Sequence, residues 1–217
     1  MTQTISSQAE ADTPAGHSPE AAPARKRPRP GERRIQILQT LAGMLEHPRG
    51  EKITTAALAA KLSVSEAALY RHFASKAQMF EGLIGFIEQT VFGLINQITT
   101  QEEHGLRQAQ AIVRMLLSFA EKNPGMTRLM VGDALVYENE RLVARMNQFF
   151  DRIESSLRQA LRAAAEAQGS LTPTVQANAQ ASVWVSFIIG RLQRYARSGF
   201  KRLPTEQLEA SLRALAQ

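Results

Sequence analysis

The sequence predicts an all-α fold in which three short N-terminal helices precede a bundle of longer helices. After residue 33, apolar residues recur with the three- and four-residue spacing of a buried helix face. No segment alternates between apolar and polar residues as a strand would, and no unit of 20–50 residues repeats. A tight turn, Leu62 to Ser65, separates two of the short helical segments. The 217 residues suffice for one or two domains.

The three short helices have recognisable ends. An apolar stripe over residues 35–45 predicts the first helix, which Pro48 to Gly50 should end. Thr54 is a plausible N-cap for a helix over 55–62. Ser63, three residues before Glu66, resembles a capping box for a third helix over about 66–72.

The longer helices follow in order. Ser75 should cap a helix that runs to about Ile98 and is roughly 35 Å long at 1.5 Å per residue. A helix over 106–122 ends at Asn123-Pro124-Gly125, and a short one reaches about Gly132. Apolar stripes over 142–161 and 184–195 predict two long helices, and Leu203-Pro204 should start a short C-terminal helix.

The positive charge is concentrated near the N-terminus. The net charge is +6 and the pI is about 10.1. Residues 25–80 hold eleven basic and four acidic residues, whereas residues 1–24 hold no Lys or Arg. We therefore divide the chain into a disordered tail with a basic arm (1–32), a helix-turn-helix domain (33–76) and a helical dimerisation and partner-binding domain (77–217).

The helix after the tight turn has the properties of a helix that reads DNA. If Leu69 and Phe73 face inward, the three residues between them must project outward, because each residue rotates the helix by about 100°. Small residues at the start of this helix let it approach base edges in the major groove. Hydroxyl, imidazole and ammonium groups around it suit phosphate oxygens. The predicted DNA contacts are Thr54, Thr55, Ser65, Ala67, Ala68, Tyr70, Arg71, His72 and Lys76.

Several function classes find no support. Cysteine is absent, which excludes disulfides and thiolate catalysis. No two of the four histidines have a metal-ligand spacing, and no phosphate loop or paired-carboxylate motif appears. We expect no enzyme activity, metal or cofactor. No apolar stretch could span a membrane and no secretory signal is present, so we expect a cytoplasmic protein.

The segment from Ile53-Thr54-Thr55-Ala56 to Phe73-Ala74-Ser75-Lys76 resembles the DNA-binding domain of TetR-family regulators. Motifs outside that domain resemble the nucleoid occlusion factors of this family over about residues 33–165. They include Phe-Ile-Glu at 86–88, Glu-Lys-Asn-Pro-Gly-Met-Thr-Arg at 121–128 and Arg-Met-Asn-Gln-Phe-Phe-Asp-Arg-Ile-Glu at 145–154.

The resemblance implies a specific function. Nucleoid occlusion factors are nucleoid-associated dimers that bind palindromic chromosomal sites and, while bound, antagonise assembly of the tubulin-like division protein FtsZ. Phe86, Lys122 and Asn123 match the surface with which the family binds FtsZ. Leu94 stands where that surface should carry a basic residue.

Dimerisation is expected through the two long C-terminal stripes, packed against their symmetry mates as a four-helix bundle. The alternative is that these stripes pack only within one chain. The predicted interface residues are Phe149, Ile153, Leu157, Trp184, Ile188 and Tyr195.

Two other functions remain open from the sequence. One is a ligand-released transcriptional repressor, as in most of the TetR family, which would need an apolar cavity in the bundle. The other is a nonspecific nucleoid-packing protein that relies on the basic arm. Phe86 is likewise ambiguous, because it lies about 120° off the apolar stripe of its helix and could meet either a second buried surface or a partner.

Overall fold

The computed structural model describes residues 31–47, 53–136 and 138–216, and all regular structure within them is helical. The predicted tail and basic arm, and the predicted helix stop at Pro48–Gly50, lie outside the described residues. The elements in chain order are α1 (Glu32–Leu45), α2 (Thr55–Lys61), α3 (Glu66–Tyr70), α4 (Lys76–Gln101), α5 (Gly105–Lys122), α6 (Pro124–Met130), the 3₁₀ helix η1 (Asp133–Leu135), α7 (Glu140–Ala167), α8 (Pro173–Arg197) and α9 (Leu208–Leu215).

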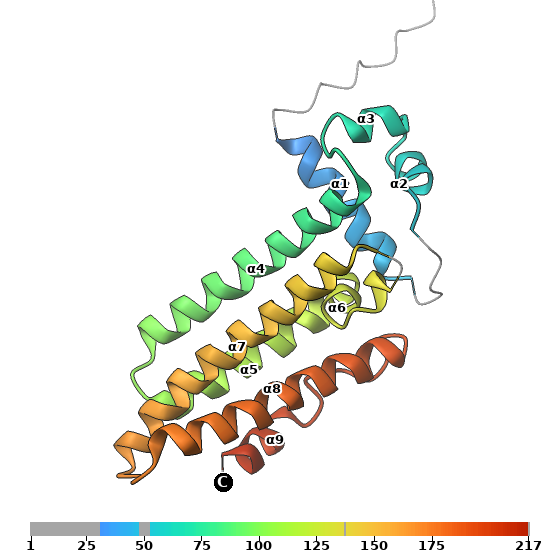
Figure 1. Cartoon of the computed structure of the whole chain (residues 1–217). Helices are drawn as coiled ribbons and strands as arrows, with labels where there is room; N and C mark the ends of the chain where they lie inside the picture. Colours follow the sequence, from blue (N-terminus) through green and yellow to red (C-terminus); the bar gives the residue numbers. More distant parts are fainter. Residues whose placement is uncertain (1–30, 48–52, 137, 217) are drawn as a thin grey trace, which may run out of the picture.

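The short helices α1, α2 and α3 gather at one end of the molecule, and α4 leads from them along the bundle (Figure 1). Helices α4, α5 and α7 lie alongside one another, with α8 and α9 beyond them. The all-α fold class is as the sequence predicts. The periodicity explains it, because the predicted stripe of α4 is buried from Phe80 to Ile95 and the core is continuous through both halves of the molecule.

Two helix ends differ from the sequence prediction. Helix α3 ends at Tyr70, although hydrogen bonds from the His72 and Phe73 amides to the Leu69 carbonyl continue the turn. Helix α9 starts at Leu208 and not after Pro204, because Gln207 has a left-handed backbone with φ 52° and interrupts the helical path.

Helix α1 joins the helix-turn-helix to the bundle. Gly125 of α6 lies so close to it that a Cβ there would be 2.0 Å from the Ala42 carbonyl oxygen. Arg128 donates from Nη1 to the carbonyls of Leu45 and His47, at 3.2 and 2.8 Å. These contacts cap the exposed carbonyls at the end of α1. The boundary we predict between residues 76 and 77 therefore falls in the first turn of a continuous helix, between units that α1 also connects.

We expect Gly125→Ala to destabilise the protein, because the added methyl group forces α1 and α6 apart. Overpacking of this kind costs about 1–3 kcal/mol. Gly43→Ala is the matched control, since nothing lies within 4 Å of a Cβ at that helical position. Thermal unfolding followed by circular dichroism should show a lower Tm for Gly125→Ala and an equal or higher Tm for Gly43→Ala. An unchanged Tm for Gly125→Ala would contradict the close packing.

Candidate nucleic-acid interface

The turn between α2 and α3 is built by capping and by one strained residue. The Ser63 and Val64 amides donate to the Ala60 and Ala59 carbonyls, both at 3.0 Å, and Ser63 has φ 54°. Ser65 is the N-cap of α3, and its hydroxyl accepts from the Ala68 amide at 3.3 Å. The predicted capping box at Ser63 is therefore wrong, because the left-handed Ser63 belongs to the turn and helix α3 begins two residues later than that box requires.

The caps place several predicted contact residues in local hydrogen bonds. The Thr54 hydroxyl accepts from the Ala57 amide at 3.1 Å, which confirms Thr54 as the N-cap of α2. The Thr55 hydroxyl donates to the Glu66 carboxylate at 2.6 Å, so it links the first turns of α2 and α3. A hydroxyl that accepts a capping hydrogen bond can still donate its own proton to another acceptor. Thr54 and Ser65 are both exposed, so their hydroxyls can be reached from outside.

The inner face of the helix-turn-helix is apolar, as its spacing predicts. Leu58, Leu69 and Phe73 are each 1% exposed, and Leu62 and Val64 pack against them while partly exposed. Burial of each large side chain contributes about 1.5–3 kcal/mol. This face fixes the orientation of α3 relative to α2.

Arg34 of α1 fastens the end of the α3 segment. Its guanidinium carbon lies 4.2 Å from the centre of the Phe73 ring, and Nη1 donates a short hydrogen bond to the His72 carbonyl. From the sequence alone, Arg34 is only one of the residues that make up the N-terminal basic charge. No local pattern signals this contact, because 38 residues separate the two partners.

The outer face carries the residues that could meet DNA. Tyr70 is 45% exposed, and Arg71 and Ala67 are also exposed. Ala68 and His72 are half-buried at the edges of this face. The structure thus brings these predicted contact residues together on one short segment, with small residues first and larger polar ones after them.

Lys76 is placed differently from the other predicted contacts. Its ammonium forms a short ion pair with Glu138, which precedes α7, and lies 5.5 Å from the centre of the Phe80 ring. The side chains of Lys76 and Glu138 are 22% and 12% exposed. An ion pair with this little exposure is screened weakly by solvent. A DNA phosphate would have to compete with Glu138 for Lys76.

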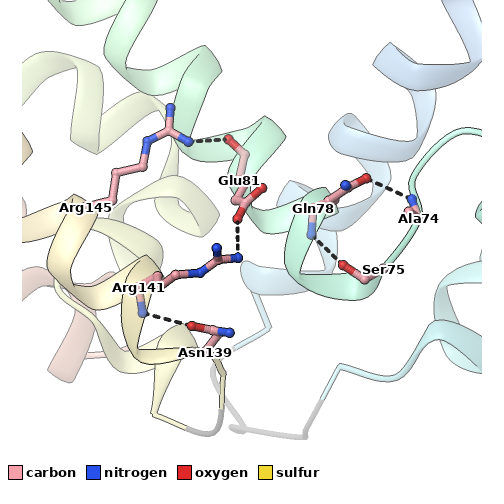
Figure 2. A network of polar contacts seen from close by, with 7 residues as sticks. All are labelled: Ala74, Ser75, Gln78, Glu81, Asn139, Arg141 and Arg145. Carbon is pink, nitrogen blue, oxygen red and sulfur yellow. Dashed lines mark hydrogen bonds and ion pairs between the residues drawn. The ribbon is translucent and has the colours of Figure 1, made fainter.

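The start of α4 is held by a reciprocal cap (Figure 2). The Ser75 hydroxyl accepts from the backbone amide of Gln78 at 3.2 Å. The side-chain oxygen of Gln78 accepts from the backbone amide of Ala74 at 2.9 Å. Both of these backbone donors would otherwise lack a partner in the helix. The cap fixes the direction in which α4 leaves the helix-turn-helix.

Further along, two arginines of α7 reach across to α4 (Figure 2). Arg141 donates to the Glu81 carboxylate at 3.3 Å, and Arg145 donates to the Glu81 carbonyl at 3.4 Å. Arg145 also makes a bidentate pair with Glu88, at 3.1 and 2.6 Å. The hydrogen bonds that Arg145 donates to the Glu88 carboxylate hold the pKa of Arg145 above its usual value. Together with Lys76–Glu138, these pairs tie α4 to α7, and no sequence pattern indicated them.

The residues predicted for partner binding lie on α4 and at the end of α5. Phe86 is 49% exposed, so it does not meet a second buried surface within the chain. Lys122 is exposed at the end of α5, and Asn123 donates from its side chain to the Phe119 carbonyl at 2.7 Å. Asn123 therefore contributes to ending α5, whatever else it binds.

The prediction of the dimer-interface residues is wrong, because their side chains are not on the surface of the single chain. Phe149, Ile153, Leu157, Trp184 and Ile188 are 0% exposed and Tyr195 is 3% exposed within the single chain. Helices α7 and α8 turn these stripes toward each other and toward α5, so the alternative of packing within one chain holds for these residues. Trp184 donates to the Leu215 carbonyl at 3.1 Å and Tyr195 to the Glu121 carbonyl at 3.0 Å.

Helix α8 also presents an outer face. Val175 and Val183 are 68% and 56% exposed on it. Between and beyond them lie the small residues Ala179, Ser186 and Gly190, at the spacing of one helical face. Small side chains let two helices approach closely. This face, and not the buried stripe, is the part of α8 that a second copy could contact.

The described residues contain neither a candidate metal cluster nor a candidate membrane-spanning helix. No cluster of three or more His, Asp or Glu residues in this part of the chain could hold a metal ion. No helix among those described has the length and apolarity to cross a membrane.

Comparison with protein families places both halves of the chain. Residues 51–83 match the family of bacterial regulatory proteins of the tetR type. Residues 103–217, more than half of the chain, match the SlmA-like family described as "Tetracyclin repressor-like, C-terminal domain".

Curated relatives extend the match over most of the chain. A protein of Alteromonas mediterranea is 50% identical over 185 residues, which are 85% of this chain and 94% of the relative. A protein of Vibrio cholerae is 51% identical over 178 residues, 82% of this chain and 90% of the relative. Both relatives are called nucleoid occlusion factor SlmA.

Solved structures support the fold. A TetR-like transcriptional regulator from Rhodococcus superposes with a TM-score of 0.68 at 18% identity, covering 88% of this chain and 99% of that one. The fatty acid degradation regulator FadR from Bacillus halodurans gives a TM-score of 0.69 at 12% identity, covering 85% and 95%. At such identities the likeness concerns the fold alone.

We expect Arg34→Lys to loosen the helix-turn-helix although it keeps the charge. Lysine cannot lie flat on the Phe73 ring while it also donates to the His72 carbonyl, and the loss should cost about 1 kcal/mol. Urea unfolding should show a lower midpoint. Arg33→Lys is the control, because Arg33 bonds only the neighbouring Gln36 side chain. Equal midpoints for the two variants would mean that the Arg34 contacts contribute nothing.

Proposed function

Because the chain belongs to the SlmA-like family of TetR-type proteins, we propose that it is a nucleoid occlusion factor: a sequence-specific DNA-binding protein that, when bound to the chromosome, antagonises assembly of FtsZ. The observation that carries this proposal is the 50% identity to proteins called SlmA over 85% of the chain, well beyond the helix-turn-helix. The protein would act in the cytoplasm, at the nucleoid.

DNA recognition is proposed to use the outer face of α3 and its flanking caps. Ala67 and Ala68 are small enough to let the helix approach base edges, where a methyl group can contact thymine. Tyr70, Arg71 and His72 supply groups for phosphate oxygens, and Thr54, Thr55 and Ser65 add hydroxyls at the starts of α2 and α3. The short α3 can contact only a few base pairs, so a second copy is needed for specific binding.

The second copy is proposed to be an identical chain. A symmetric dimer places two reading helices about 34 Å apart and requires a palindromic site. The exposed apolar and small residues on the outer face of α8, with the exposed side of α7, are the surface we assign to that dimer. The pairing still forms a four-helix bundle, but with the opposite helix faces from those the sequence stripes indicated.

FtsZ is proposed to bind along α4 and α5. These helices are antiparallel, and Phe86 lies 15 residues before the end of α4 while Lys122 lies 17 residues after the start of α5. At 1.5 Å per residue, both stand roughly 22–26 Å from the connection between the helices, and therefore at a similar level. An exposed aromatic ring and an exposed cation at a similar level along the two helices suit a peptide with apolar and acidic groups.

A ligand-released repressor is the alternative. It requires an apolar cavity inside the bundle. The two pockets described, of about 570 and 370 Å³, both lie at the surface and are lined mainly by charged and polar side chains. A bound small molecule that weakens DNA binding would favour this alternative over nucleoid occlusion.

The direct test of the proposed function is sedimentation of FtsZ polymers with the full chain, with and without its cognate duplex. The pellet should shrink most when both protein and duplex are present. An unchanged pellet, with no association with FtsZ in either case, would overturn the proposal. Equal affinity for random and palindromic duplex at about 150 mM salt would instead indicate a nonspecific nucleoid-packing protein.

The Lys76 contact can be tested through its ion pair. Lys76→Ala should weaken duplex binding broadly and lower the slope of log affinity against log salt by about one unit. Glu138→Gln should tighten binding at low salt, because it frees Lys76 for a phosphate. Glu209→Gln is the matched control, since it breaks the Arg114 pair far from the helix-turn-helix. If Lys76→Ala leaves the slope unchanged, Lys76 does not contact DNA.

Phe86→Ala should separate the two activities. The exposed ring leaves no cavity when truncated, so duplex affinity and Tm should be unchanged while the effect on FtsZ sedimentation falls. Leu171→Ala, at a side chain that is 98% exposed on the α7–α8 connection, serves as control. Equal loss of DNA binding and FtsZ antagonism in Phe86→Ala would show that the ring has a structural role.

A further inference from the structure

A pocket of about 570 Å³, lined mainly by charged side chains, lies at the C-terminal end of α8. None of the proposed activities uses it. We call it the basic pocket. Its lining combines three cations, one acid, one apolar side chain and one hydroxyl. The lining residues are Arg194, Lys201, Arg202, Leu203, Thr205 and Glu206.

The turn that forms the basic pocket is strained. Gly199 and Phe200 both have left-handed backbones, with φ 62° and 65°. Residues other than glycine seldom adopt this backbone, so surrounding contacts must hold Phe200 in it. Its amide donates to the Tyr195 carbonyl at 3.0 Å and its ring meets the Tyr195 ring edge-on at 5.1 Å. The Ser198 hydroxyl then accepts from the Lys201 and Arg202 amides, at 3.1 and 2.9 Å. The turn brings the chain back so that Lys201 and Arg202 share a pocket with Arg194.

The charges that the turn gathers are unbalanced. Within the described part of the chain, the side chains of Arg194, Arg197, Lys201 and Arg202 make no hydrogen bond or ion pair. Glu206 is the single acid in the lining. Like charges held together in a concave site repel one another, and an anion relieves that repulsion. Arg191, which lies nearby, is engaged, because it donates to the Glu206 carbonyl and the Ser211 hydroxyl, both at 2.9 Å.

The opposite wall is fixed in place. The Arg191 bonds hold the segment before α9 against α8, and the Thr205 hydroxyl donates to the Glu121 carboxylate of α5. Pro204 is buried between these points. A wall that is ordered before a ligand arrives adds little entropy cost to binding.

We propose that the basic pocket binds an acidic peptide segment that also carries an apolar side chain. Leu203 is 45% exposed at the pocket and offers a contact for that side chain. Arginine pairs with carboxylates through two parallel hydrogen bonds, and Arg194 and Arg202 are both available for this. The peptide is a segment of a partner protein, held by at least two carboxylates.

Nucleic acid fits the pocket less well. The adjoining pocket of about 370 Å³ shares Thr205 and is lined by Arg114 and Lys122 as well as by Glu121 and Glu209, so its charges balance and it does not extend the cationic surface that a phosphate backbone would follow. No aromatic ring lines the basic pocket, so a base would have no ring on which to stack. The pocket shares no residue with α3 or with Phe86, so this inference does not depend on the proposed function.

The test is fluorescence anisotropy of a labelled short peptide in which glutamate and leucine alternate, titrated with the full-length protein. A second peptide replaces glutamate with glutamine. The protein should bind the acidic peptide and not its neutral counterpart. The double variant Arg194→Ala/Arg202→Ala should bind the acidic peptide at least about tenfold more weakly, because it loses the charged hydrogen bonds from both guanidinium groups to the peptide carboxylates. The matched control Arg107→Ala/Arg213→Ala removes the same charge at exposed positions outside the pocket and should bind like the parent protein.

Any of three peptide-binding outcomes would overturn the inference. They are the absence of binding to the acidic peptide, equal binding of both peptides, and equal weakening by the two double variants, which would indicate general charge attraction. The inference would also be overturned if Arg194→Ala/Arg202→Ala lost duplex affinity while its peptide binding stayed unchanged. That result would assign the basic pocket to DNA phosphates instead.

Discussion

Helix α4 belongs to both halves of the molecule, and burial of its apolar stripe is the constraint on which the rest depends. Near its start, Phe80 and Leu83 are 1% exposed in a core shared with α1, and further along Ile87 and Val91 are fully buried in the bundle. A helix of 26 residues that is buried along most of its length behaves as a rigid rod. The orientation of α3, the proposed DNA-reading helix, is therefore fixed relative to the C-terminal bundle.

Polar contacts add direction to this apolar packing. The ion pairs between α4 and α7 fix the rotation of α4 about its own axis. Arg34 of α1 holds the end of the α3 segment. Each pair is partly exposed and stabilises modestly. Their common effect is geometric: they leave the outer face of α3 as the surface that projects from the helix-turn-helix. Lys76 differs from the other predicted contacts, because Glu138 already pairs with the ammonium group that a phosphate would need.

The three surfaces that we propose for ligands come from separate elements. They are the outer face of α3 for DNA, the surface of α4 and α5 with Phe86 for FtsZ, and the basic pocket at the end of α8 for an acidic peptide. Among the described residues, the arginines of the basic pocket have no carboxylate partner, whereas Arg114, Arg145 and Arg162 each have one.

The sequence by itself determined the helices, their caps at Thr54 and Ser75, and the outward face of α3, because these depend on residues within a few turns of one another. The family resemblance likewise rested on contiguous motifs. Only the tertiary structure decided which apolar stripes are internal, since Phe149 and Trp184 have the same periodicity whether they meet α5 or a second chain. It also decided the Lys76–Glu138 pair and the basic pocket, because contacts between residues far apart in the chain are set by how whole helices pack and leave no periodic signal in the sequence.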